Sequence, residues 1–539
     1  MFLLPSISIP PRPVCEAVHI QRGRGQNAGV SSPDSAQVAS GHPETTDAAC
    51  LILAAGGNAV DALVAAAWTA CVAEPIFCSP GGGGHAMIRM PGKAPVIADF
   101  FTQTPRRRRM DALEFYPIHG NFGTDVQEFH VGMGAAATPG MVAGLFDLQR
   151  RHGTLPMTAL VEPAVAVARD GCALTATQAF ALRILEPIVR ATPESGVMFG
   201  LASHDAPLPE VGAMIRNRPL ADWIERVAAD GPDSLHHGEQ AIAIAEDAQT
   251  HGGHLTLADL AGYRVHWRRP MRWTLGDATV WSNPPPAFGG LMVALMTQAL
   301  EHRLPPGIRF GDDVHLDALT AAMRVSEHER KRLEQPDTLG CNRRLMQTFR
   351  QLEGELRVSR GTTHIGVRDA RGGFAGMTAS NGEGCGRVVP GTGFMLNNML
   401  GEEDLNRPGF HNWPLNRRLA SMMAPTLVLH KGRRMLLGSG GSNRIRTAIA
   451  QVLANLMHFE LDLADAIRAP RLHVEGDRLA IEHPHAAWPQ QVADWLTRNA
   501  PEAKRWPEPN LYFGGVHAVA DGEAAADARR GGVARTIRQ

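Results

Sequence analysis

The segment Gly361-Thr362-Thr363 opens the clearest hairpin pattern in this 539-residue chain. Apolar and other residues alternate from Thr363 to Val367. The turn-rich stretch 369–373 follows, and apolar residues resume at Phe374. Period-two alternation on either side of a short glycine-containing turn predicts a β-hairpin. The residue at the head of this hairpin is therefore Thr362, directly behind a glycine.

Thr362 would become a new N-terminus if the chain cut its own Gly361-Thr362 bond. A free α-amine would then stand beside the threonine hydroxyl, so that one residue supplies both the nucleophile and the general base. This arrangement is typical of an N-terminal-nucleophile hydrolase. Paired threonines at the start of a strand are also common in structural strands, so the segment alone leaves a structural role open.

Composition favours one large soluble globular unit, because 44% of the residues are hydrophobic and 20% are charged. The formal net charge of -1 gives no reason to expect nucleic acid or an anionic membrane as a partner. The local basic run Arg106 to Arg109 is typical of a solvated loop. No uninterrupted apolar run is long enough to span a bilayer.

The seven cysteines contain no CxxC pair, and their odd number argues against a complete disulfide framework. A reducing compartment is the simpler interpretation. Residues 1–33 form a proline-interrupted, irregular segment and a poor signal peptide. We therefore expect a cytoplasmic protein, with export left open if the true start differs from Met1.

Residues 42–73 carry strong helix signals. The capping cluster 42–47 precedes an apolar run that stops at Gly56-Gly57, and Asn58 then starts an alanine-rich helix that ends near Ala73. Four glycines at 81–84 precede a strand at 85–89, which suits backbone passing close to backbone or substrate. A phosphate loop would need a following Lys-Ser/Thr, which is absent here.

The C-terminal part contains local signals of the same kinds. Residues 425–430 and 434–437 predict a second hairpin, the glycine-rich run 438–442 comes next, and 445–457 has helical apolar spacing. Successive glycines that open a helix can aim backbone N–H groups at a developing negative charge. A plain linker explains the same residues equally well.

Taken together, these stretches resemble the γ-glutamyltransferase (γ-glutamyl transpeptidase) family from about residue 34 to the C-terminus. The segments that carry the resemblance are 56–62, 74–75, 81–84, 138–145, 152–156, 257–263 and 284–290. The resemblance implies an α+β fold, a four-layer αββα sandwich of the N-terminal-nucleophile type. It further implies autocleavage into a large subunit, 34–361 behind the irregular segment 1–33, and a small subunit, 362–539, which together form one integrated unit.

The resemblance also implies catalytic roles for four residues. Thr362 matches the family's nucleophile, at the start of a Thr-Thr-His strand. Gly440 and Gly441 are the best match to the two glycines of the oxyanion hole, with a register uncertain by one. Ser380 falls where the family has a hydroxyl that orients the nucleophile or its amine, and Thr378 is the second such hydroxyl, with a plain strand role left open for both.

The substrate pocket is where the sequence departs from the family. Phe101 stands where γ-glutamyltransferases carry the arginine that pairs with the α-carboxylate of the γ-glutamyl group, and an aromatic ring cannot imitate that contact. Of the Ser-Ser pair for the same carboxylate, Ser421 remains and Met422 replaces the second serine. The strand asparagine is displaced by one to Asn381, and Glu402 is nearest to the aspartate of the amine-binding side.

We therefore expect a threonine amidohydrolase or acyltransferase that cleaves γ-glutamyl amides such as glutathione through an acyl-threonine intermediate. One of Arg106 to Arg109 would have to repair the clamp, or the acyl group lacks an α-carboxylate, as in the related glutaryl acylases and oxamate amidohydrolases. An inactive binding relative is the other alternative. The expected partners are a small amide substrate, water or an amine acceptor, and the two fragments of the chain, with a homo-oligomer left open.

A metal enzyme is disfavoured by spacing. His328-Glu329 comes nearest to a zinc helix, but position 332, where an HExxH pattern needs its second histidine, is Arg332. We expect no metal and no cofactor.

Overall fold

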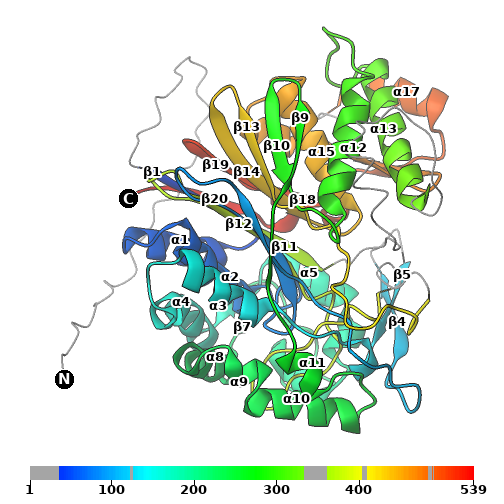
Figure 1. Ribbon diagram of the computed structural model, residues 1–539. Helices are drawn as coiled ribbons and strands as arrows, with labels where there is room; N and C mark the ends of the chain where they lie inside the picture. Colours follow the sequence, from blue (N-terminus) through cyan, green and yellow to red (C-terminus); the bar gives the residue numbers. More distant parts are fainter. Residues whose placement is uncertain (1–34, 122–125, 333–360, 403–408, 483–487, 490) are drawn as a thin grey trace.

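The computed structural model describes residues 35–121, 126–332, 361–402, 409–482, 488–489 and 491–539. Two antiparallel sheets stack face to face, and helices cover the outer face of each (Figure 1). The expected α+β class with four αββα layers is therefore confirmed. The segment 1–33, expected to be irregular, lies outside the described residues.

The first sheet has seven strands in the order β20-β1-β11-β12-β2-β3-β8, and each neighbouring pair is antiparallel. Its members are β1 (Ser35–Ser40), β2 (Gly83–Arg89), β3 (Val96–Phe100), β8 (His266–Arg268), β11 (Thr362–Arg368), β12 (Phe374–Ser380) and β20 (Val533–Arg538). Strands from both sides of Gly361 are interleaved in this order, because β1 lies between β20 and β11. The two halves of the chain therefore share one sheet.

The second sheet has six strands in the order β19-β18-β14-β13-β10-β9. Its members are β9 (Met271–Leu275), β10 (Ala278–Ser282), β13 (Thr426–His430), β14 (Arg433–Gly440), β18 (Gly515–Ala520) and β19 (Glu523–Ala525). An apolar cluster fills the space between the sheets: Ala39, Met87, Ile97, Phe374, Leu427, Leu436 and Val519. Gly376 of β12 leaves room for this packing, since a Cβ there would lie 2.0 Å from Leu436 Cδ2.

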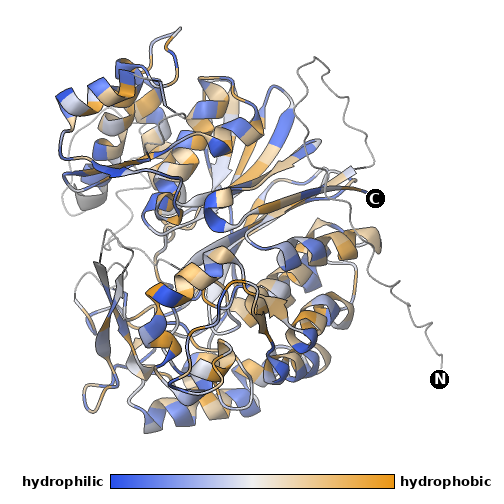
Figure 2. Cartoon of the chain, turned by 180° about the vertical axis from the view of Figure 1, so that it is seen from behind, coloured by the Kyte–Doolittle hydropathy of each residue, from blue (hydrophilic) through white to orange (hydrophobic). Residues whose placement is uncertain are grey.

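Three helices lie on the first sheet, α1 (Pro43–Ala54), α2 (Ala59–Ala73) and α3 (Met141–His152), and α4 (Met157–Asp170) packs against α2. The second sheet is covered by α12 (Gly289–Glu301), α15 (Arg444–Met457) and α16 (Leu463–Arg468). The predictions for α1, α2 and α15 are confirmed within one or two residues. Figure 2 shows hydrophilic and hydrophobic residues mixed along the outer helices, as expected where one face packs and the other meets solvent.

The remaining elements pack around the sandwich. The helices are α5 (Ala176–Ile184), α6 (Glu186–Val189), α7 (Pro193–Met198), α8 (Arg218–Asp230), α9 (Asp233–His236), α10 (Glu239–Thr250), α11 (Leu257–Ala261), α13 (Asp313–Arg332) and α17 (Gln491–Asn499). The short strands are β4 (Tyr116–Asn121), β5 (Val126–Val131), β6 (Cys172–Ala173), β7 (Met214–Ile215), β15 (Leu472–Glu475), β16 (Arg478–Glu482) and β17 (Lys504–Trp506). Among the described helices, none combines the length and apolar character that a membrane crossing requires.

Both glycine-rich segments are more regular than the sequence suggested. Strand β2 begins at Gly83, inside the glycine block, and β14 continues through Gly440. A Cβ at Gly82 would lie 2.4 Å from the Ser380 carbonyl oxygen, and one at Gly83 would lie 2.6 Å from that of Phe100. The prediction that backbone passes close to backbone here is confirmed, and the glycines are needed because a side chain would fill the space between neighbouring strands.

The start of α2 is held by a buried carboxylate. Asn58 caps the helix, and Asp61 completes a capping box by accepting from the Asn58 N–H at 2.9 Å. Asp61 also accepts from Thr154 N at 2.8 Å and from Thr154 Oγ1 at 2.6 Å, and it is fully buried. One side chain thereby ties α2 to the loop between α3 and α4.

Replacing Asp61 with alanine should lower the free energy of unfolding by about 3–5 kcal/mol, because several buried donors lose a charged acceptor. Urea unfolding followed by circular dichroism would measure the loss. The exposed Asp170→Ala, at the C-terminal end of α4, is the matched control and should change stability by no more than about 0.5 kcal/mol. Equal stability of the two variants would contradict the assigned capping role.

Candidate active site

Thr362 is the first residue of β11, and its side chain points toward the second sheet. The direction follows from its neighbours two and four residues along, because alternate residues of a strand share a face. A Cβ on Gly438 of β14 would lie 2.3 Å from His364 Nδ1, and Gly366 faces Val519 of β18. Thr362 is buried between the sheets, with 1% of its surface exposed.

Ser380 lies opposite Thr362 in the register of β11 and β12. Its hydroxyl donates to the carbonyl oxygen of Gly361 and accepts from the N–H of Gly382 at 3.1 Å. The serine therefore contacts the peptide bond that the sequence predicts to be cut. A hydroxyl at this carbonyl can stabilise negative charge on its oxygen.

The end of β14 reaches the nucleophile from the second sheet. A Cβ on Gly440 would lie 2.1 Å from the Thr362 carbonyl oxygen, so only glycine fits this contact. Arg530 donates to the same oxygen at 3.2 Å. Beyond Gly440 the backbone turns with positive φ at Gly441 (117°) and Ser442 (59°) before α15 begins.

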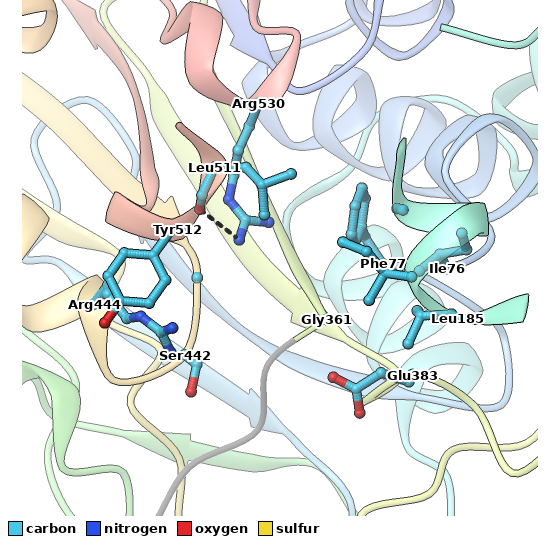
Figure 3. A pocket seen from close by; sticks show the side chains of 13 residues that line it. Ile76, Phe77, Leu185, Gly361, Glu383, Ser442, Arg444, Leu511, Tyr512 and Arg530 are labelled. Atoms are coloured by element: carbon cyan, nitrogen blue, oxygen red, sulfur yellow. Dashed lines mark hydrogen bonds between the residues drawn. The ribbon is translucent and has the colours of Figure 1, made fainter. Parts of the chain in front are cut away.

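A pocket opens beside Gly361 (Figure 3). Apolar side chains from three segments form much of its wall: Ile76, Phe77, Ala181, Ile184, Leu185, Leu511 and Tyr512. Gly441 and Ser442 also line it, whereas Gly440 does not. Of the two glycines expected at the oxyanion hole, only Gly441 thus reaches the pocket.

Three charged side chains complete the pocket wall. Glu383 lies on one side of Gly361, while Arg444 and Arg530 lie on the other (Figure 3). Sequence reasoning did not single out any of these three residues. Glu383 follows β12 by three residues and Arg444 begins α15, so proximity to Ser380 and Gly441 was the only signal that could have drawn attention to them.

Thr363 points to the opposite face from Thr362, toward α1 and α2. Its hydroxyl donates to Glu74 Oε2 at 2.8 Å, and Thr45 donates to Glu74 Oε1 at 3.0 Å. Complete burial raises the pKa of Glu74 to about 7, although the two hydroxyl contacts favour the ionised form. The nucleophile strand is thus fixed from behind by a carboxyl group that titrates near neutrality.

Thr378 does not line the Gly361 pocket. Its hydroxyl is hydrogen bonded to His364 Nδ1 at 2.8 Å, and both side chains are fully buried between the sheets. Burial holds the pKa of His364 well below its usual range, so the imidazole is neutral. The pair packs against Gly438 at a point two residues along β11 from Thr362, and so away from the end of the strand.

Phe101 is fully buried in an apolar cluster that also contains Ala137 and Met399. Across the sheet, Thr362 pairs with Ser380 and Ser380 pairs with Gly83. Gly83 in turn lies against the backbone of Phe101. These three strand spacings place the two backbones roughly 14 Å apart. An arginine could bridge much of that distance, whereas a phenylalanine cannot.

Ser421, the serine expected to bind the same carboxylate, already has a hydrogen-bond partner. Ser421 is hydrogen bonded through Oγ to His85 Nε2 at 3.2 Å. Burial lowers the pKa of His85 to about 4, which keeps the ring neutral. No cation replaces the clamp arginine at this serine among the described contacts.

The arginine run following Phe101 makes its contacts elsewhere. Arg106 lines a separate pocket with Arg264, Arg417 and Arg418. Arg108 donates to the Trp413 carbonyl. Arg109 donates to carbonyls of α10, among them Gln249 O at 2.7 Å. None of these residues, nor Arg107, lines the Gly361 pocket, so the structure gives no support to a repair from this run.

Glu402, the acidic residue expected on the amine-binding side, lies close to the nucleophile. Glu402 Oε1 lies 3.2 Å from where a Cβ of Gly382 would be, and Gly382 in turn abuts Gly361. Asn381 lies beside Gly82, with its side-chain oxygen 3.1 Å from the position of a Cβ there. The substrate-binding roles of Glu402 and Asn381 stay predictions. Within the described part of the chain, no three histidine, cysteine, aspartate or glutamate side chains gather as a metal site.

Solved structures share this architecture. The crystal structure of cephalosporin acylase from Bacillus halodurans superposes with a TM-score of 0.76 over 96% of this chain and 99% of that chain, at 21% identity. At this identity the likeness speaks for the fold alone. The fold is that of the N-terminal-nucleophile hydrolases.

The gamma-glutamyltranspeptidase family model matches residues 45–537, and the chain belongs to that family. It is similar to the Acylase ACY 1 proenzyme of Pseudomonas sp. (strain SE83), with 29% identity over 515 residues, 91% of this chain and 90% of the relative. It is also similar to the glutathione hydrolase proenzyme of Escherichia coli (strain K12), with 29% identity over 483 residues, 83% of this chain and 82% of the relative. The protein is thus an enzyme of the hydrolase and acyltransferase class.

The raised pKa of Glu74 generates a test of stability against pH. Because the folded pKa of about 7 exceeds the reference value of 4.5, ionisation of Glu74 opposes folding. Relative to Glu74→Gln, the wild type should lose about 3 kcal/mol of unfolding free energy between pH 4.5 and pH 7, and little more above pH 7.

Urea unfolding of both proteins at half-unit pH steps would measure the difference. The exposed Glu502→Gln is the control and should give a curve parallel to the wild type. A parallel curve for Glu74→Gln as well would contradict the assigned titration.

Proposed function

We propose that the chain cuts its own Gly361-Thr362 bond and that Thr362 then acts as the N-terminal nucleophile of an amidohydrolase or acyltransferase. The observation that carries the proposal is the position of Thr362 at the first residue of β11, with the Ser380 hydroxyl on the Gly361 carbonyl oxygen. The large fragment would then end at Gly361 and the small one would run from 362 to 539. The proenzyme names of both reported relatives agree with such processing.

In self-cleavage, Thr362 Oγ attacks the carbonyl carbon of Gly361. Ser380 donates to the oxygen on which negative charge develops, so it lowers the barrier as an oxyanion donor does. The C–N bond breaks, the nitrogen takes a proton and becomes the α-amine of Thr362, and an ester joins Gly361 to Thr362 Oγ. Water then hydrolyses this ester and frees the nucleophile.

In turnover, Thr362 Oγ attacks the substrate amide while its own α-amine takes the proton. We assign the oxyanion hole to the N–H groups of Gly441 and Ser442. The assignment is supported by their place in the pocket wall and by Gly440, which is still part of β14. Water or an amine acceptor then releases the acyl group from Thr362.

The proposed acyl donor is a γ-glutamyl amide such as glutathione. The pocket beside Gly361 carries Glu383, and Glu402 lies close to Gly382, so anionic groups are available for an α-ammonium group. The similarity to the glutathione hydrolase proenzyme favours the same substrate class.

A second candidate is a glutaryl-type acylase, and the buried Phe101 favours it. The residue provides no cation for an α-carboxylate, and Ser421 is engaged by His85. The similarity to the Acylase ACY 1 proenzyme is in keeping with this substrate class.

We propose a cytoplasmic location on the basis of the thiols. Cys71 and Cys78 keep their thiols, because their sulfur atoms lie 3.5 Å apart as a hydrogen-bonded pair and form no disulfide. Adjacent unpaired thiols are typical of a reducing compartment.

Thr362→Ala should abolish both processing and amide turnover, since it removes the attacking oxygen. Denaturing electrophoresis of the purified protein should show two fragments for the wild type and one uncut chain for the variant. Thr497→Ala, on the exposed face of α17, is the control and should be cut normally. A Thr362→Ala chain cut at the same bond would contradict the proposal, and an uncut wild type would support an inactive relative.

A pair of anilides separates the two candidate substrates. Glutaryl anilide differs from γ-glutamyl anilide only by lacking the α-amino group. Faster turnover of the γ-glutamyl compound by the cut wild type, by about tenfold or more in kcat/KM, is expected if acidic residues bind the ammonium. Faster turnover of the glutaryl compound would instead establish the second candidate.

A further inference from the structure

Arg444, the first residue of α15, is a buried cation without an anion. Only 4% of its surface is exposed, and its guanidinium makes no hydrogen bond or ion pair with any described residue. Its Nε is buried and lacks an acceptor. The charged group lies over the ring of Tyr512, whose centroid is 4.0 Å from Arg444 Cζ.

Three other buried arginines are paired with carboxylates. Arg446 contacts Glu327 at 2.8 Å, Arg471 contacts Asp527 at 2.6 Å, and Arg529 contacts Glu482 at 2.6 Å. Burial of a guanidinium is unfavourable by several kcal/mol unless an anion offsets it. The fold meets this requirement at these three positions and leaves it unmet at Arg444, whereas the buried Arg530 donates only to backbone carbonyl oxygens.

The surroundings of Arg444 increase the need for an anion. The residue stands at the N-terminus of a 14-residue helix, where the helix dipole is positive and where the first turn carries no acidic residue. A cation at this end of a helix is unfavourable by itself, whereas a carboxylate there would meet both the guanidinium and the helix N-terminus.

Arg444 also faces the reacting bond. It lines the pocket that contains Gly361, Gly441 and Ser442. Figure 3 shows it under the Tyr512 ring and beside Ser442, with Glu383 on the far side of Gly361. Arg530, the other cation of the pocket, already donates to the carbonyl oxygen of Thr362.

We propose that Arg444 binds the carboxylate of the acyl group, and that the enzyme therefore selects amides of acyl chains that end in a carboxylate. Arg444 would take over the task of the clamp that is absent at Phe101. A γ-glutamyl group would place its α-carboxylate at Arg444 and its ammonium toward Glu383, and a glutaryl group would use Arg444 alone. This inference rests on the proposed acyl-transfer function, because it takes the Gly361 pocket as the acyl pocket.

Calorimetric titration of the mature wild type with glutarate and with L-glutamate tests binding without turnover. We expect both anions to bind, and Arg444→Met to weaken their binding by about 100-fold, since a buried bidentate contact is lost. Arg444→Lys should recover part of it. The exposed Arg505→Met, which removes the same charge from β17, is the matched control and should bind like the wild type.

Turnover separates this inference from the proposed function. Arg444→Met should reduce kcat/KM for glutaryl anilide by about 100-fold while leaving the uncharged pentanoyl anilide within about threefold of the wild type. Arg444-dependent binding of glutarate by a protein that cleaves no amide would uphold the inference and refute the proposed function. Equal losses on both anilides, or glutarate binding that survives in Arg444→Met, would overturn the inference.

Thermal unfolding distinguishes ligand binding by Arg444 from a role in stabilising the fold, because the two roles predict opposite changes in the unfolding temperature of Arg444→Met. Without a ligand, Arg444→Met should unfold at the same temperature as the wild type or at a higher one, because an unpaired buried charge is replaced by an apolar chain. Glutarate should raise the unfolding temperature of the wild type only. A variant that unfolds several degrees lower would indicate that Arg444 supports the fold instead.

Discussion

The position of β11 inside the seven-stranded sheet is the constraint on which the site depends. Pairing with β1 on one side and β12 on the other fixes both the height and the facing of Thr362. A slip of one residue would turn its hydroxyl toward α2 and bring Thr363 toward the second sheet. The Glu74 contact with Thr363 resists such a slip, because the slip would remove one of the two hydroxyl donors of a buried carboxyl group.

Close backbone contact explains why so many glycines surround the nucleophile. Gly440 and Gly438 of β14 face Thr362 and His364 across the gap between the sheets, and Gly82 and Gly83 lie against β12 and β3. Any side chain there would push the strands apart and move the carbonyl of Gly361 away from Ser380. The small residues thus keep the reacting groups within hydrogen-bond distance, as catalysis by orientation requires.

Charge placement distinguishes this chain within its family. The clamp position holds a buried Phe101, the nearby arginine run contacts other carbonyls, and the Gly361 pocket contains Arg444 and Glu383 instead. Prediction from sequence worked for α1, α2, α15 and both hairpins, because caps, periodicity and turns are local signals. It failed to find Arg444, since neither spacing nor composition tells which of many arginines is buried without a partner.

The sequence by itself determined the nucleophile candidate Thr362, the family and the layered fold, because these follow from local patterns and from matching segments along the chain. Only the tertiary structure decided that Ser380 reaches the Gly361 carbonyl, that Thr378 contacts His364 instead, and that the glycine-rich run stays a strand through Gly440. These contacts join residues from different strands and sheets. Their distances depend on register and on sheet packing, which a single sequence does not specify.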